Sequence, residues 1–115
     1  MMIGDATTAG LQAALHALDA RRAAHETNIA NVETPGYKAR AVDFESELRR
    51  AMDRGGVPTV TPDVSVSNAP GRANGNNVNV GREMVALTET ALTQELLIRA
   101  MNDKFGLVRT AVGNG

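Results

Sequence analysis

The chain has 115 residues and no cysteine, and its 12 basic and 13 acidic residues leave a formal net charge of −1. This length fits one small domain, the lack of cysteine excludes disulfide and thiolate chemistry, and the balanced charge argues against a nucleic-acid or anionic-membrane surface. The chain contains two Phe, one Tyr and no Trp. Because aromatic rings supply much of the burial in small cores, we expect aliphatic stripes that are buried largely against other chains.

Residues 1–10 contain Asp5 and neither a basic residue nor a long apolar run. We therefore expect no cleaved signal peptide and no transmembrane helix at this end.

The first predicted element is a helix over residues 7–32. Between Gly10 and Pro35 the chain has neither glycine nor proline, and alternating spacings of four and three form a heptad seam. The seam consists of Leu11, Leu15, Leu18, Arg22, His25, Ile29 and Val32, and its five apolar members are predicted assembly residues. The arginine pairs at 21/22 and 49/50 are expected on solvated helix faces rather than in phosphate sites.

Residues 28–37 read Asn-Ile-Ala-Asn-Val-Glu-Thr-Pro-Gly-Tyr and predict a rigid corner. Asn31 tolerates the left-handed conformation that ends many helices. Pro35 fixes φ at about −65°, and Gly36 can take the positive φ at the third position of a type II turn. Tyr37 is a candidate anchor against a neighbouring surface. The predicted site consists of Asn28, Ile29, Ala30, Asn31, Thr34, Pro35, Gly36 and Tyr37.

The middle of the chain, residues 33–81, is predicted to hold this turn, a short helix and a flexible segment. The short helix covers about residues 43–53, with Glu45 and Arg49 as an i,i+4 ion pair. From residue 55 to 79 the chain is rich in Gly, Pro and Asn. Val64 and Val66 alternate with serines, which allows a small β-hairpin. We favour a loop that orders against a partner over this hairpin.

The last predicted element is a helix over residues 82–112, with Asn79 as its N-cap and Glu83 near its positive end. Its seam also alternates spacings of three and four. The seam consists of Met84, Leu87, Ala91, Gln94, Ile98, Met101, Phe105, Val108 and Val112, and the apolar members up to Val108 are predicted assembly residues. Three leucines at 92, 96 and 97 widen the apolar stripe beyond this seam.

The expected fold is therefore all-α, a single domain over residues 1–115 whose two long amphipathic helices pack as an antiparallel, coiled-coil-like pair. The two seams are too wide to satisfy each other, so the remaining apolar surface is expected to serve assembly.

No catalytic, cofactor or metal motif emerges from the sequence. His25-Glu26 begins like a zinc-protease motif, but Ile29 stands where the second histidine is required. His16 and His25 are nine residues apart, which places them on nearly opposite faces of a helix. We therefore expect no enzyme activity, no cofactor, no metal site and no small-molecule substrate.

The ten-residue corner resembles the N-terminal motif of bacterial flagellar axial proteins, the group of rod, hook and hook-associated proteins. Within this group the short chain is similar to the FlgB family of proximal-rod proteins, which it resembles more than the related FlgC. Three further stretches carry the similarity: Tyr37-Lys38-Ala39-Arg40 leading to Asp43-Phe44-Glu45, Gly75-Asn76-Asn77-Val78 leading to Arg82-Glu83-Met84, and Met101-Asn102-Asp103-Lys104-Phe105.

The resemblance implies a structural subunit of the rod, the periplasm-spanning drive shaft that transmits torque for motility. It implies polymerisation through the terminal helices and type III export without a cleaved signal peptide. The implied partners are copies of the chain, the rod proteins FlgC and FlgF, the adaptor FliE, the MS ring and the export gate.

A soluble helical adaptor or chaperone-like hairpin is the alternative function. It would bind a partner helix in a groove and form a discrete dimer or heterodimer, whereas a rod subunit is expected to polymerise. A small enzyme would need a polar cluster in a pocket, and the sequence offers none.

Overall fold

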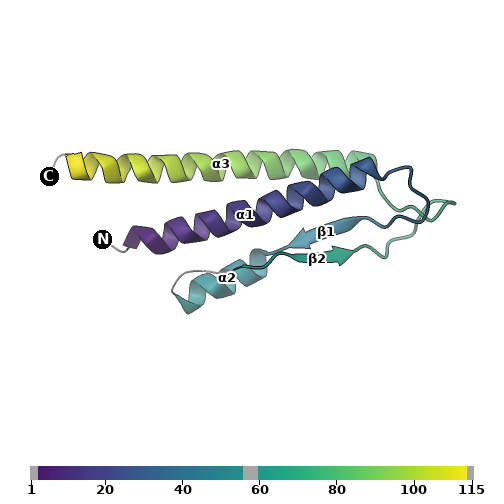
Figure 1. The fold of residues 1–115 in the computed structure, drawn as a ribbon, viewed down its shortest axis with the longest axis horizontal. Coiled ribbons are helices and arrows are strands. Elements are labelled where there is room, and N and C mark those ends of the chain that lie inside the picture. The colour runs from purple at the N-terminus through teal and green to yellow at the C-terminus, as the bar shows by residue number, and fades with distance from the viewer. Residues whose placement is uncertain (1–2, 56–59, 114–115) are drawn as a thin grey trace.

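Two long helices set the length of the molecule in the computed structural model (Figure 1). The first helix, α1, spans Ile3–Ala30, and the last, α3, spans Val80–Gly113. They run antiparallel, so α1 begins at the end of the molecule where α3 ends (Figure 1). Both helices were predicted, with bounds that differ from the observed ones by one to four residues.

The structure describes residues 3–55 and 60–113, and the side chains of 7–55 and 60–103 within them. The molecule measures 66 × 26 × 14 Å along its principal axes. Among the described helices, none is long and apolar enough to cross a membrane.

Both long helices form where the chain lacks strong helix breakers. The α1 sequence is rich in alanine, which has the highest helix propensity. The start of α3 is fixed by Asn79, whose Oδ1 accepts the backbone N–H of Arg82 at 3.0 Å. This is the N-cap geometry, because an N-cap side chain satisfies an amide of the first turn. The predicted N-cap is confirmed.

A two-stranded antiparallel sheet lies beside α1. Strand β1 (Arg40–Asp43) pairs with β2 (Asp63–Val66), and the register places Val42 opposite Val64. The preference for a loop in this region was therefore wrong at residues 63–66. The predicted alternative, a hairpin, had both strands within residues 55–79. The partner of β2 is instead β1, which lies outside this segment, because α2 and not a short turn separates the two strands in the sequence.

In the sequence, the short helix α2 (Glu45–Arg54) falls between β1 and β2, and its bounds are close to the predicted 43–53. Glu45 forms an ion pair with Arg21 of α1, at 2.6 Å, and not the predicted pair with Arg49. Gly10 makes room for α2, because a Cβ there would lie 2.9 Å from the sulfur of Met52.

The core is small. Its central cluster joins α1 to the start of α2, and three half-buried residues pack against it; the cluster consists of Ala14, Ala17, Leu18 and Phe44, surrounded by Leu48, Val60 and Leu97. Most of α3 thus lies outside the core, although it packs along α1.

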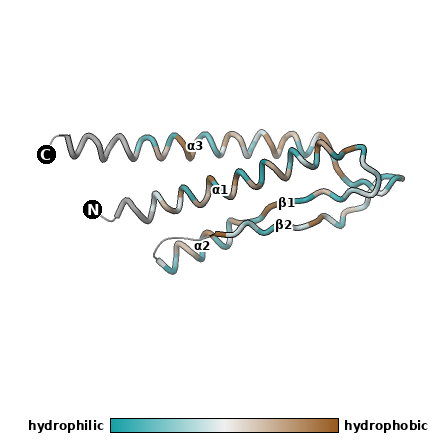
Figure 2. The backbone as a smooth tube through the Cα atoms, viewed as in Figure 1, coloured by the Kyte–Doolittle hydropathy of each residue, from teal (hydrophilic) through white to brown (hydrophobic). Residues whose placement is uncertain are grey.

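The rotation of α3 differs from the one that the predicted seam implies. Met84 and Ile98 were predicted in the seam, but their side chains are 56% and 49% exposed. Thr90, which lies outside the predicted seam, is buried, as is Gln94, a polar member of that seam. The reason is that apolar residues occur on more than one side of α3, since Met84 and Leu92 are both exposed although they lie on different sides of the helix. Figure 2 shows hydrophobic and hydrophilic residues alternating along the coloured part of α3. Contacts with polar groups of α1, and not hydrophobicity alone, select the side that faces inward.

The other predicted seam residues are mostly half-buried. Leu18 is buried, and Leu11, Leu15, Ile29, Val32, Leu87, Ala91 and Met101 are partly exposed. The side chains of Phe105 and Val108 lie outside the described residues.

Candidate functional site

The corner between α1 and α3 gathers most of the long-range polar contacts of the chain. It lies at the end of the molecule where α1 ends and α3 begins, opposite the start of α1 and the end of α3 (Figure 1). It consists of residues 28–40, which run from the last residues of α1 to the first residue of β1, and residues 67–79, which follow β2 and lead into α3.

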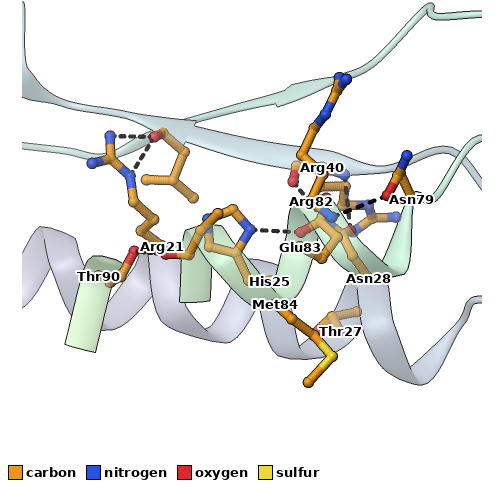
Figure 3. Close-up of polar contacts among 12 residues, drawn as sticks. Arg21, His25, Thr27, Asn28, Arg40, Asn79, Arg82, Glu83, Met84 and Thr90 are labelled. Carbon is orange, nitrogen blue, oxygen red and sulfur yellow. Dashed lines mark hydrogen bonds and ion pairs between the residues drawn. The ribbon is translucent and has the colours of Figure 1, made fainter. Parts of the chain in front are cut away.

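Asn28 is the buried centre of this corner. It is 0% exposed and uses both polar atoms of its amide. Its Nδ2 donates to the carbonyl of Arg40 at 2.8 Å and to Glu83 Oε2 at 3.0 Å. Its Oδ1 accepts the backbone N–H of Arg40 at 2.9 Å and the hydroxyl of Tyr37 at 3.0 Å. Figure 3 shows Arg40 and Glu83 on either side of Asn28. One side chain therefore joins α1, β1 and α3.

The turn that follows α1 has the predicted type. Gly36 has φ +73°, and the N–H of Tyr37 donates to the carbonyl of Thr34 at 3.2 Å. These are the features of a type II turn with glycine at its third position. The hydroxyl of Tyr37 points back into its own chain, towards Asn28.

Asn31 ends α1 in a different way from the one predicted. No non-glycine residue in the described chain has a positive φ, so Asn31 is not left-handed. Its Nδ2 instead donates to the carbonyl of Thr27 at 2.8 Å, and its Oδ1 accepts the Thr34 hydroxyl at 3.1 Å. The side chain thus adds a second donor to the Thr27 carbonyl, which also accepts the backbone N–H of Asn31 at 3.1 Å.

Asn76 binds the corner from the opposite side. It is also 0% exposed. Its Nδ2 donates to the carbonyls of Asn31 and Thr34, both at 2.8 Å, and its Oδ1 accepts the N–H of Val78 at 2.8 Å. Both carbonyls also accept an N–H group within the turn, so Asn76 supplies a second donor to each and ties the turn after α1 to a segment more than forty residues away in the chain.

Three further side chains donate to or accept from backbone groups across the corner. Arg72 donates to the carbonyls of Val78 at 2.7 Å and Val32 at 2.5 Å. Lys38 Nζ donates to the carbonyl of Gly75 at 2.6 Å. The side chain of Asn77 accepts the N–H of Ala39 at 2.7 Å and donates to the carbonyls of Ser67 and Ala69.

The two halves of the corner approach each other at glycines. Gly36 donates its N–H to the carbonyl of Asn74 at 2.9 Å. A Cβ on Gly75 would lie 3.4 Å from the Cα of Gly36, and a Cβ on Gly71 would lie only 2.7 Å from the carbonyl oxygen of Gly75. A side chain at position 71 would therefore force the backbone of this loop to move.

A mostly buried pair extends this network along the two long helices. His25 Nδ1 lies 2.6 Å from Glu83 Oε2, and both side chains are nearly nine-tenths buried. Figure 3 shows His25 pointing towards Glu83 while Met84 points away. Further along, Gln94 donates to Asp19 at 2.7 Å. These polar contacts fix the rotation of α3 against α1.

Arg21 ties β1 and α2 to α1. Its guanidinium donates to the carbonyl of Val42 at 2.7 Å and to Glu45 at 2.6 Å, and it lies 4.7 Å from the ring centre of Phe44. The guanidinium of Arg21 lowers the pKa of the Glu45 carboxyl below its usual range. The expectation of a solvated Arg21 was wrong, because its fork of donors satisfies a backbone carbonyl and a carboxylate together.

Comparison with known proteins identifies the family. No family model matches the chain. A flagellar basal body rod protein FlgB of Bacillus subtilis is 30% identical over 130 aligned residues, which cover 100% of this chain and 99% of the relative. The chain belongs to the FlgB family of flagellar basal body rod proteins. FlgB of Escherichia coli is 29% identical and covers 85% of the chain and 86% of the relative. FlgB of Cereibacter sphaeroides is 31% identical and covers 75% of the chain and 77% of the relative.

As an FlgB-family member, the chain is a structural rod protein and not an enzyme. The corner has the character of a structural site. Among the described side chains, no buried polar atom lacks a partner, and no group of three or more histidine and acidic side chains could hold a metal ion. The donors and acceptors of the corner are largely consumed by backbone groups of the same chain, so their evident task is to hold its shape.

The predicted site residues all lie in the corner, but not all of them take part in its network. Asn28, Asn31, Thr34 and Tyr37 bond through their side chains and Gly36 through its N–H, whereas Ala30 and Pro35 present exposed surface and Ile29 is half-buried. Asn76, Asn77 and Arg72 were missed as site residues. The asparagines from 74 to 79 were the available signal, because asparagine is the residue that most readily bonds backbone groups in turns.

Proposed function

We propose that this FlgB-family chain polymerises with copies of itself through its terminal helices to build the proximal rod, which transmits torque for motility. In this proposal the chain acts as one domain over residues 1–115, and α1 and α3 form a coiled-coil-like pair. The buried and half-buried residues of α3 include a set that recurs at spacings of four and three, which supports such a pair. The set is Glu83, Leu87, Thr90, Gln94, Leu97 and Met101, and Ala86 and Ala91 beside it are half-buried as well.

One observation carries the proposal: large apolar side chains stand on the outside of α3. Six of them are between 37% and 65% exposed: Val80, Met84, Val85, Leu92, Leu96 and Ile98. Exposed apolar side chains in this number on a small protein mark interaction surfaces. The predicted assembly residues Met84 and Ile98 belong to this set. The small core, with a single buried aromatic ring in its central cluster, supports the view that copies complete the burial.

The corner supplies stiffness in this proposal. Torque transmission requires that the angle between the elements of one subunit does not change under load. The buried amides of Asn28 and Asn76 cross-link segments far apart in the chain, and the exposed turn at residues 34–36 is placed to brace a neighbouring subunit. Replacing Pro35 and Gly36 by alanine is then expected to reduce motility; normal swimming by this variant would disprove the bracing role.

The relatives are named as basal-body rod proteins, so assembly with other basal-body proteins follows. More specifically, we propose contacts with FlgC, FlgF, the adaptor FliE, the MS ring and the export gate. We also propose that the chain is exported by the type III route without a cleaved signal peptide.

The first test is mass spectrometry of purified basal bodies from the source bacterium. The chain is expected in amounts that match the other rod proteins, with its first residues intact. If the other rod proteins are found and this chain is absent, the proposal fails, and a discrete complex with one partner becomes the better account.

A further inference from the structure

A groove runs beside the α1–α3 pair and opens towards the start of α2. Its volume is about 560 Å³. On α3 it is lined by five residues, Ala86, Glu89, Thr90, Thr93 and Leu97, four of which recur at spacings of four, three and four. On α1 its lining runs from Ala14 to His25.

Apart from the carboxylate of Glu89, the polar side chains that line this groove bond within the same chain. The hydroxyl of Thr90 donates to the carbonyl of Ala86 at 2.8 Å, and the hydroxyl of Thr93 donates to that of Glu89 at 2.9 Å. Both threonines therefore offer methyl groups, while Arg21 and His25 are held by the intrachain contacts described above. With Leu18, Phe44 and Leu97 as larger lining residues, the groove is suited to an apolar occupant.

A ridge of matching length lies on another side of α3. Val85, Leu92 and Leu96 are each more than half exposed. At 100° per residue they fall within an arc of about 40°, roughly a third of a turn away from the side that lines the groove. Ridge and groove both extend over eleven residue steps of α3, which is about 16 Å. Packing of one helix ridge into the groove between two others is the usual way in which helices associate.

The charges of the two surfaces agree with this pairing. The groove lining holds two carboxylates, Glu45 and Glu89, against the single guanidinium of Arg21. The ridge lies between Arg82 and Arg99 on the same helix, and Arg99 is ion-paired with Glu95 of α3 at 2.8 Å. Arg82 is therefore the cation at one end of the ridge, and the groove lining has an excess of one carboxylate. Opposite charges favour this docking over that of two ridges or two grooves.

We propose that the α3 ridge of one copy docks into the groove of a second copy. This inference rests on the proposed function and names the contact through which copies associate. Because ridge and groove are different surfaces of one molecule, the contact is head-to-tail, and each added copy leaves one free ridge and one free groove. Such a contact extends into a filament when its rotation does not close a ring.

The chain has no cysteine, so the contact can be tested by introduced cysteines without background. Leu92→Cys marks the ridge and Thr93→Cys the groove, and both positions are exposed. The two variants are expressed together in motile cells, basal bodies are purified, and disulfides between chains are read on non-reducing gels. The matched control replaces Thr93→Cys with Gln12→Cys, an exposed position on α1 outside the groove.

We expect a disulfide between the cysteine at position 92 of one copy and the cysteine at position 93 of another. We expect no disulfide when Leu92→Cys is expressed alone, and none when it is expressed with the Gln12→Cys control. A 92–92 disulfide would show a symmetric contact and overturn the proposal. Incorporation of both variants without a 92–93 disulfide would overturn it as well, while leaving the rod function intact. Absence of the chain from the rod would instead refute the proposed function, and the docking with it.

A second pair of variants measures the contribution of the ridge. Leu92→Glu places a charge on the ridge, whereas Thr88→Glu places it on an exposed position beside the ridge. Since neither residue is buried in the monomer, both variants should keep the helical circular dichroism of the parent chain. Leu92→Glu is expected to reduce incorporation by more than about tenfold, the effect of a 1.4 kcal/mol loss, and Thr88→Glu by much less. Equal incorporation of the two variants would contradict the proposal.

Discussion

Asn28→Ala is expected to be the most damaging single truncation in the corner. The variant removes four hydrogen bonds, two of which satisfy the N–H and the carbonyl of Arg40 at the start of β1. Of the other two partners, the half-buried Tyr37 hydroxyl can turn to water and Glu83 keeps its contact with His25. Two backbone groups thus lose their partner at about 1–3 kcal/mol each, so the free energy of unfolding should fall by about 2–6 kcal/mol.

Such a loss is large for a small domain, whose total stability is about 5–15 kcal/mol. It is measured by urea unfolding of the full chain, followed by far-ultraviolet circular dichroism. Asn31→Ala is the matched control, because it makes the same change in the same motif. The Asn31 side chain is only half-buried and bonds Thr27 and Thr34 locally, where water can replace it, so its loss should be below about 1 kcal/mol.

The comparison between the two asparagines decides the point. If Asn28→Ala and Asn31→Ala lower the free energy of unfolding equally, the burial of Asn28 is not what holds the corner. A loss below 1 kcal/mol for Asn28→Ala would refute the reasoning in the same way.

Three further outcomes are expected. Gly71→Ala should lower the free energy of unfolding by about 1–3 kcal/mol, because its Cβ would lie 2.7 Å from the Gly75 oxygen; a thermal melt unchanged from that of the parent would contradict this. Arg21 lowers the pKa of Glu45, so this carboxylate stabilises the fold above its ordinary pKa of about 4.3 and ceases to do so as pH falls through the lowered value. The parent chain should accordingly be more stable than Glu45→Gln at pH 7, with the difference vanishing in strong acid; a difference independent of pH would refute the assignment. Gln94→Leu should leave the free energy of unfolding unchanged or raise it by up to about 1 kcal/mol, because its bonding partners are exposed and apolar burial is gained; a clear loss in urea titration would show that the polar contact itself holds the helices.

The long helices could be predicted because their cause is local. Residues 11–34 contain neither glycine nor proline, and residues 82–112 contain only Gly106. The corner turn was likewise predictable, since Pro35 and Gly36 restrict the backbone at their own positions. The rotation of α3 was not predictable from its own sequence, because it depends on contacts such as that of His25 with Glu83, whose members are 58 residues apart.

The sheet and residues 67–79 of the corner could not be predicted from the sequence for a related reason. Two four-residue strands with largely exposed side chains give little periodicity, and α2 separates them. The partners of Asn28, Asn76 and Arg72 are mainly backbone atoms, which every residue possesses. A side chain that bonds the backbone therefore has no complementary residue type in the sequence from which the contact could be predicted.

The long span of the corner contacts also sets an order of events during synthesis. The end of α1 leaves the ribosome early, yet the groups that satisfy it belong to residues that follow much later. Asn76 bonds the carbonyls of Asn31 and Thr34, and Glu83 bonds Asn28. A nascent chain that stops before these residues lacks these contacts and cannot close its corner. The corner is therefore complete only after Glu83 has been translated.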